Sequence, residues 1–147
     1  RPEPQTESFA QPQRPNLDPD VGRYQEELQA KVARVRELLQ DHLEGVELHV
    51  QESPPLNYRM RAEFRVWHAG DDAHFALFDP VTKKPILIEE YPLASKRINK
   101  LMADLLQALK EDENLKKKLF QVELISNTDD EALVCLVYKK KLDAEEW

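Results

Sequence analysis

The chain has 147 residues, of which 41% are hydrophobic and 33% are charged, and its formal net charge is −7. This length suits one domain with a sizeable core, and no apolar run approaches the roughly 20 residues needed to cross a bilayer. Proteins that coat nucleic acid by bulk attraction are usually basic, so any nucleic-acid contact of this acidic chain must be a local patch. The single cysteine excludes an internal disulfide framework and a multi-cysteine metal site.

The first 19 residues differ in composition from the rest. They hold five of the ten prolines, among Gln, Glu, Asn and Ser, and cannot bury enough apolar surface to order themselves. We therefore predict a flexible leader over residues 1–19 and one domain over residues 20–147. The chain starts at Arg1 without an initiator methionine or a signal-peptide core, which indicates a segment of a longer protein.

Two segments have the spacing of amphipathic helices. Apolar residues three and four apart from Val21 to His42, closed by Gly45, predict a first helix, which we expect to face the core rather than form a coiled coil. A second helix is expected to open near Ser95 and to end between residues 111 and 114. Its apolar stripe comprises Ile98, Leu101, Met102, Leu105, Leu106 and Leu109.

The remaining segments favour β-strands. The expected strands are Val46–Val50, Asn57–His68, His74–Phe78, Ile86–Ile88, Leu119–Ile125 and Ala132–Tyr138. Short polar turns join them into a three-stranded meander and a terminal hairpin. The expected fold class is α+β, with an antiparallel sheet of two hairpin or meander units packed with the two helices.

The strand from Asn57 to His68 organises this arrangement. Alternation along a strand sends Met60, Ala62, Phe64 and Val66 to one face, which we interpret as core. The opposite face carries Arg59, Arg61, Glu63, Arg65 and Trp67. Guanidinium groups beside an aromatic ring suit phosphate binding and base stacking. A solvated strand face with one internal Arg–Glu pair is the alternative interpretation.

Two lysine clusters flank the terminal hairpin, at residues 116–118 and 139–141. Antiparallel pairing would bring the start of one strand beside the end of the other, so both clusters would meet in one positive patch. The alternative is that these lysines only protect exposed strand ends against aggregation.

Other chemistry is missing from the sequence. The three glycines are isolated, so no glycine-rich loop can hold a nucleotide or a cofactor phosphate. The four histidines lack metal-ligand spacing, and the paired acids fall at turns or strand ends, where solvation explains them. Cys135 lies in an apolar strand, and we expect a buried, inert thiol there.

Several motifs in order resemble one family. They are the stretch from Tyr58 to His68, then Tyr91–Ser95 with Ile98–Met102, then Lys118–Val122, and finally Tyr138–Asp143 ending at Trp147. From about Tyr24 to Trp147 the chain is similar to the N-terminal part of bacterial tRNA (uracil-5-)-methyltransferases. Only the proline-rich leader falls outside the resemblance.

This resemblance implies a cytoplasmic, S-adenosylmethionine-dependent enzyme that methylates C5 of the T-loop uridine of tRNA, and the same loop of tmRNA. In that family a cysteine adds to C6 of the base and a glutamate removes the C5 proton, both from a C-terminal Rossmann-like domain. Cys135 does not match the Ser-Cys-Asn-Pro context of that nucleophile, and Asp79-Pro80-Val81 does not match the Asp-Pro-Pro-Arg motif. The resemblance therefore implies an RNA-docking segment that binds no cofactor and is inactive alone.

The resemblance also implies roles for single residues. Arg65 and Phe120 fall on positions that hold the T-loop, one through phosphate and one through base stacking, whereas Lys139 stands where relatives carry His. With the Arg row and the lysine clusters, the candidate RNA-binding residues are Arg59, Arg61, Arg65, Trp67, Lys118, Phe120 and Lys139. No catalytic or metal-binding residue is expected.

Two hypotheses from different classes remain open. The first is the RNA-docking part of a methyltransferase, a monomer whose partner is the T-arm of tRNA or the same arm of tmRNA, with no membrane contact. The second is a stand-alone α+β domain that binds protein through the acidic surface of its first helix.

Overall fold

The computed structural model describes residues 14–141 and 143–146, so most of the predicted leader and the terminal Trp147 lie outside the described residues. Its helices are η1 (Val21–Arg23), α1 (Tyr24–Leu38), η2 (Gln40–His42), α2 (Lys96–Glu111), α3 (Glu113–Lys116) and η3 (Ala144–Glu146). Its strands are β1 (Arg61–Ala69), β2 (Asp72–Phe78), β3 (Pro85–Ile88), β4 (Leu119–Ser126) and β5 (Ala132–Tyr138). The α+β class is confirmed.

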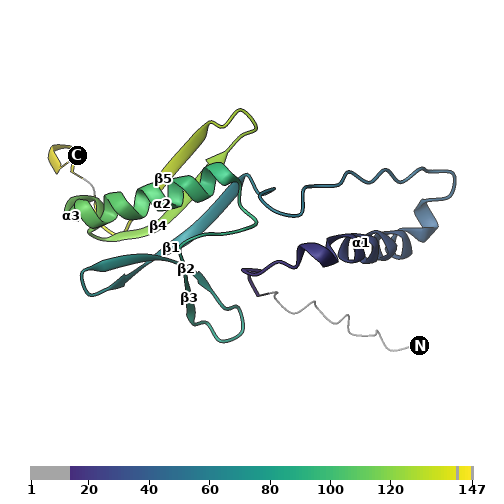
Figure 1. Ribbon diagram of the computed structural model, residues 1–147, viewed down its shortest axis with the longest axis horizontal. Helices are drawn as coiled ribbons and strands as arrows, with labels where there is room; N and C mark the ends of the chain where they lie inside the picture. Colours follow the sequence, from purple (N-terminus) through teal and green to yellow (C-terminus); the bar gives the residue numbers. More distant parts are fainter. Residues whose placement is uncertain (1–13, 142, 147) are drawn as a thin grey trace, which may run out of the picture.

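The five strands form one antiparallel sheet in the order β3-β2-β1-β4-β5. The two predicted units are joined because β4 pairs with β1, with Phe64 opposite Val122. Figure 1 shows α2 lying across one face of this sheet, while no helix of the described residues lies over the other face. The structure therefore has a covered face and an open face.

The core lies between α2 and the covered face. Ser95 caps α2 by accepting a hydrogen bond from the backbone N–H of Ile98 at 3.1 Å, as its sequence position predicts. Ile98, Met102 and Leu109 are buried on this helix. They pack with Phe64, whose ring centroid lies 5.7 Å from that of Phe75 on β2. These buried rings and aliphatic chains fix the position of β1.

The first helix is where the fold differs most from expectation. Helix α1 contains no buried residue, so its predicted core-facing role is wrong. Figure 1 shows it apart from the sheet, beyond an extended segment over residues 43–57. Its Tyr24 hydroxyl donates to the carbonyl of Ser53 in that segment at 2.6 Å. Gln25 of the helix also donates a hydrogen bond to the Glu52 carboxylate at 3.1 Å, so α1 contacts this segment instead of the sheet.

Two other local predictions also fail. The expected strand Val46–Val50 is absent, since none of these residues pairs with another strand. Met60 precedes β1 and is 39% exposed, so it does not belong to the core as predicted. Of the predicted core face of the strand, only Ala62, Phe64 and Val66 are buried.

The end of the leader that the structure describes contacts the domain. Leu17 packs partly buried against the core, and the Arg14 guanidinium lies 2.9 Å from the carboxylate of Asp79. Asp79 also accepts hydrogen bonds from the backbone N–H groups of Val81 and Thr82. The placement of the boundary between leader and domain at residue 20 stays a prediction.

Candidate nucleic-acid interface

Strand β1 presents the predicted polar residues on the open face. Arg61, Glu63, Arg65 and Trp67 are exposed and alternate with the three buried residues. Arg59 falls outside β1, where its backbone pairs with Ala94 and its guanidinium carbon lies 6.0 Å from the Tyr91 ring centroid. Arg59 is therefore separate from the row of arginines that the sequence predicted.

Arg61 is paired with acidic groups. Its guanidinium contacts Glu123 of β4 at 2.5 Å and Glu63 of its own strand at 3.4 Å. The two glutamates stand directly opposite each other in the β1–β4 register. Because one cation serves two carboxylates, this trio carries a net negative charge and is a poor place for a phosphate.

A register shift in β4 places Phe120 on the open face. Leu119 pairs with Tyr138, and Gln121 pairs with Val137, so Phe120 is an extra residue in β4. An extra residue bends a strand and redirects its side chain. The ladder between β1 and β4 ends at Arg65 and Gln121, which puts the Phe120 ring next to Arg65.

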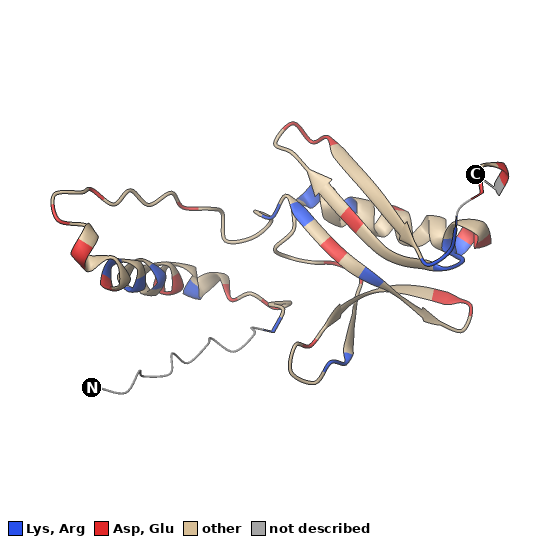
Figure 2. Cartoon of the chain, turned by 180° about the vertical axis from the view of Figure 1, so that it is seen from behind, with Lys and Arg blue, Asp and Glu red and all other residues tan. Residues whose placement is uncertain are grey.

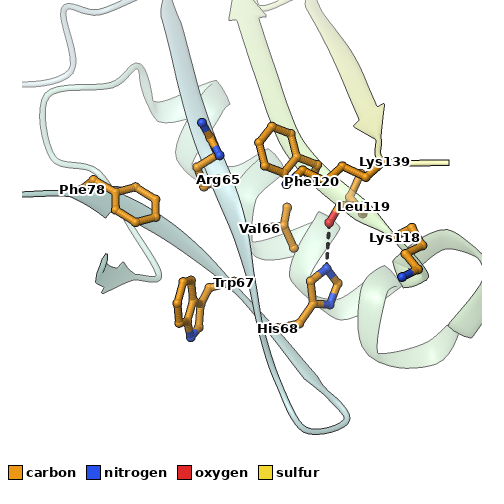
Figure 3. Close-up of a pocket in the computed structure, with 9 residues that line it drawn as sticks. All are labelled: Arg65, Val66, Trp67, His68, Phe78, Lys118, Leu119, Phe120 and Lys139. Atoms are coloured by element: carbon orange, nitrogen blue, oxygen red, sulfur yellow. Dashed lines mark hydrogen bonds between the residues drawn. The ribbon is translucent and has the colours of Figure 1, made fainter. Parts of the chain in front are cut away.

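Two cations, one on β1 and one directly after β5, contact the Phe120 ring. The guanidinium carbon of Arg65 and the ammonium nitrogen of Lys139 each lie 4.0 Å from the ring centroid. Figure 3 shows the ring between these two side chains. Cation–π attraction of this kind holds long, flexible side chains in place. The ring and its two cations form one unit built from β1, β4 and the residue after β5.

Two more aromatic rings lie beside this unit. The Trp67 and Phe78 centroids are 6.4 Å apart in an edge-on arrangement, and the Arg65 guanidinium carbon is 6.0 Å from the Phe78 centroid. Together they border a hollow of about 380 Å³. Its lining comprises Arg65, Val66, Trp67, His68, Phe78, Lys118, Leu119, Phe120 and Lys139.

The backbone around the hollow is fixed by two hydrogen bonds. The His68 Nε2 atom lies 2.7 Å from the carbonyl oxygen of Leu119. Since that oxygen can only accept, His68 donates from Nε2 and bridges β1 and β4 where their ladder has ended. The Lys139 N–H donates to the Lys118 carbonyl at 2.9 Å, which brings the two lysine clusters together as predicted.

Lys116 is an exception among the clustered lysines. Its side chain is buried, and its ammonium contacts the Glu113 carboxylate at 2.8 Å and the Asp71 carbonyl at 2.5 Å. The hydrogen bond to Glu113, opposed by desolvation, raises the pKa of Lys116 above its ordinary value. Lys116 therefore anchors the β1–β2 turn to α3 and is not part of an exposed patch. Figure 2 shows the basic residues near the start of β4 and the end of β5.

The structure thus divides the seven predicted RNA-binding residues. It brings Arg65, Trp67, Lys118, Phe120 and Lys139 to one hollow, and leaves Arg59 and Arg61 elsewhere. Phe78 was not among the residues predicted from the sequence, although the position of the β1–β2 turn predicts the face on which it lies. That turn pairs Trp67 with His74, and Phe78 follows His74 by an even number of residues, on the same face.

The prediction of a buried thiol is wrong. Cys135 is exposed, because β5 is the last strand of the sheet and this residue points to the open face opposite Glu123.

Among residues 14–141 and 143–146, no group of three or more His, Cys, Asp or Glu could hold a metal ion. No helix in the same residues is long and apolar enough to span a membrane.

Comparisons with known proteins agree with the resemblance. The family model described as tRNA (Uracil-5-)-methyltransferase matches residues 23–147. The chain belongs to this family.

Relatives named "tRNA/tmRNA (uracil-C(5))-methyltransferase" come from several bacteria. One from Vibrio parahaemolyticus is 45% identical over 131 residues, which cover 89% of this chain and 35% of the relative. One from Idiomarina loihiensis is 44% identical over 87% of this chain and 34% of its own length. One from Photobacterium profundum is 44% identical over 84% and 33%. The chain thus spans about a third of the length of these methyltransferases.

Proposed function

We propose that this chain is the RNA-docking part of a longer, cytoplasmic methyltransferase that forms 5-methyluridine in the T-loop of tRNA or tmRNA. The observation that carries the proposal is the Phe120 ring held between Arg65 and Lys139 at the edge of an aromatic hollow. Aromatic rings beside guanidinium and ammonium groups suit unpaired, splayed bases and the phosphates that join them.

The proposal includes a rearrangement at Phe120. Arg65 and Lys139 already contact its ring, each at 4.0 Å, so a base can stack on it only by displacing one of them. Lys139 is the side chain to move, because its ammonium sits on a flexible stem and Arg65 also lies near the Phe78 ring. The displaced ammonium then becomes available for a phosphate of the same loop.

The cluster of Arg61, Glu63 and Glu123 on β1 and β4 limits the area of the open face that RNA can contact. Arg61 pairs with Glu63 and Glu123, which leaves uncompensated negative charge on the middle of the open face. A phosphate backbone would be repelled there and attracted to the end of the sheet that carries Arg65, Lys118 and Lys139. The RNA therefore enters from the end of β1 that leads into the β2 turn.

S-adenosylmethionine does not fit this hollow. None of its lining residues is acidic, so nothing there can bind the ribose hydroxyls of the cofactor through a carboxylate. Its three cationic residues would repel the sulfonium. We infer that the cofactor binds to another part of the full-length enzyme, and that the 147-residue chain transfers no methyl group on its own.

Fluorescence anisotropy with a labelled T-arm stem-loop tests the proposal. The 147-residue chain should bind it in a salt-dependent way, and more tightly than a duplex of the same stem sequence without an unpaired loop, since stacking on Phe120 needs an unpaired base. No binding to the stem-loop at low salt would refute RNA docking. That result would favour the alternative of a protein-interaction domain.

A further inference from the structure

The two edges of the sheet are built differently. Strand β3 has only four residues, begins with Pro85 and follows Lys83 and Lys84. Short length, proline and lysine are the usual means by which proteins prevent an edge strand from pairing with another chain. Strand β5, at the other edge, has seven residues from Ala132 to Tyr138, with neither a proline nor a charged side chain.

Strand β5 is also poorly covered on both faces. On the open face Leu133 is 57% exposed, Val137 is 38% exposed and Cys135 is exposed. On the helix side Val134 remains 40% exposed, because α2 packs mainly on β2 and β4 rather than on β5. Every second backbone amide of an edge strand points away from the sheet. Within the part of the chain that the structure describes, β5 pairs with no strand along its outer edge, no element covers its open face, and only Leu136 and Tyr138 pack against the core on the helix side.

The sequence of β5 is that of an interior strand. Strands buried on both faces have near-continuous apolar runs, whereas exposed edge strands alternate or carry charge. β5 has the sequence Ala-Leu-Val-Cys-Leu-Val-Tyr, which is the continuous apolar run of a buried strand, yet it lies at an edge of the sheet. An uncharged edge of this length would promote aggregation if it stayed uncovered.

We propose that β5 is an interior strand in the full-length enzyme, paired along its free edge with a β-strand from the part of the polypeptide outside this chain. Its relatives are about three times as long as the matched region, which leaves ample chain to supply the strand. The inference shares with the proposed function the premise that this chain is part of a longer enzyme, but it does not depend on RNA binding. The added strand is apolar on both faces.

A second copy of this chain is the competing occupant. Antiparallel pairing of two β5 strands about a two-fold axis at Cys135 would put Glu131 of one copy opposite Lys139 of the other. It would also place the two Cys135 thiols side by side at the centre. This arrangement predicts a dimer that oxidation links through Cys135, and protection of β5 that increases with concentration.

Hydrogen exchange and thiol labelling, followed by mass spectrometry, distinguish these occupants. We expect the β5 amides to exchange at least tenfold more slowly in the full-length enzyme than in the 147-residue chain. Cys135 should react readily with a maleimide only in the shorter chain. The β3 amides should exchange alike in both. Equal exchange of β5 in the two proteins would overturn the proposal, as would β5 protection in the shorter chain that rises with concentration.

A pair of matched variants provides a second test. Leu133→Lys places a charge on β5, and Leu87→Lys places one on the open face of β3, where Leu87 is 48% exposed. Leu133→Lys should lower the melting temperature of the full-length enzyme by several degrees and leave that of the 147-residue chain unchanged, whereas Leu87→Lys should change neither. Leu133 does not line the Phe120 hollow, so T-arm binding by the shorter chain should survive both variants. If Leu133→Lys leaves the melting temperature of the full-length enzyme unchanged, β5 is not an interior strand.

Discussion

Replacement of Arg65 by alanine, compared with the same change at Arg61, gives the most direct test of the proposed RNA contact. Both arginines lie on the open face of β1, and strand alternation alone does not distinguish them. In the structure Arg65 contacts the Phe120 ring, whereas Arg61 is paired with Glu63 and Glu123. The two variants remove the same charge from the same strand at two sites that differ in their surroundings.

The expected magnitude follows from counterion release. A guanidinium that neutralises one phosphate contributes about 0.7 to 0.9 to the slope of log affinity against log salt. A fourfold rise in salt, from 50 to 200 mM, changes log salt by about 0.6, so one lost contact makes the wild-type advantage shrink roughly threefold over that range. Arg65→Ala should weaken binding of the T-arm at low salt. The ratio of the wild-type affinity to the variant affinity should then fall roughly threefold as the salt concentration rises to 200 mM.

Arg61→Ala should leave the slope unchanged. Four residues along a strand span about 13 Å, which exceeds the Debye length of roughly 8 Å at physiological salt. The charge change at Arg61 is therefore largely screened from a phosphate bound at Arg65 at the upper end of the salt range, and since Arg61 contacts no phosphate in the proposed complex, its removal changes no counterion release. Anisotropy titrations of both variants at four or more salt concentrations provide the measurement. Equal slopes for wild type and Arg65→Ala, or a loss of slope in Arg61→Ala, would refute the assigned footprint.

The remaining predictions concern stacking, packing and pH. Phe120→Ala should cost roughly 1–3 kcal/mol of T-arm binding with nearly unchanged salt slope, because stacking releases no counterions; a reduced slope in the same titrations would show that the ring acts mainly by positioning its cations. Phe64→Ala should lower the free energy of unfolding in urea by about 3–5 kcal/mol, since its ring is buried against two others, whereas Met60→Ala should cost less than about 1 kcal/mol at its exposed position. The pKa of Asp79 is lowered from its ordinary value near 3.8, first by the hydrogen bond from the Thr82 backbone. Its stabilisation is therefore present above that value and lost as pH falls through the lower folded pKa. Urea unfolding should show Asp79→Ala less stable than wild type at pH 7, and the difference should shrink below about pH 4; a constant difference would mean that Asp79 acts through packing alone.

Periodicity predicted those parts of the fold in which local pattern and tertiary packing agree. The stripe of α2, its Ser95 cap and the alternation of Ala62, Phe64 and Val66 are all consequences of one apolar surface meeting another. Such packing requires apolar residues at regular spacing, which can be recognised in the sequence. The terminal hairpin was predictable for the same reason, together with the polar loop between its strands.

The failed predictions share a different physical cause. Val46–Val50 alternates like a strand but has no neighbour to pair with, and α1 has a helical stripe but no place on the sheet beside α2. Cys135 belongs to an apolar run that lies at the edge of the sheet, and local pattern does not reveal that position. In each case the missing information is which element lies next to the segment, and a period of two or 3.6 residues does not contain it.

The candidate site was predictable in its residues more than in its geometry. The Arg row and the lysine clusters pointed to one patch, and the family resemblance selected Arg65 and Phe120. The pairing of Arg61 with two glutamates and the burial of Lys116 depend on cross-strand register and on a turn 45 residues away in sequence. Those contacts decide which cations remain available to a ligand.

The extra residue at Phe120 makes the site depend on the length of β4 as well as on its composition. Between the pairs Leu119–Tyr138 and Gln121–Val137, β4 holds one residue more than β5. Deletion of a single residue there would restore a regular ladder, remove the outward-facing ring and leave Arg65 and Lys139 without a common partner. Substitutions can adjust this site one contact at a time, whereas a one-residue change in length removes it as a whole. The site is therefore expected to tolerate varied side chains more readily than insertions or deletions between residues 119 and 121.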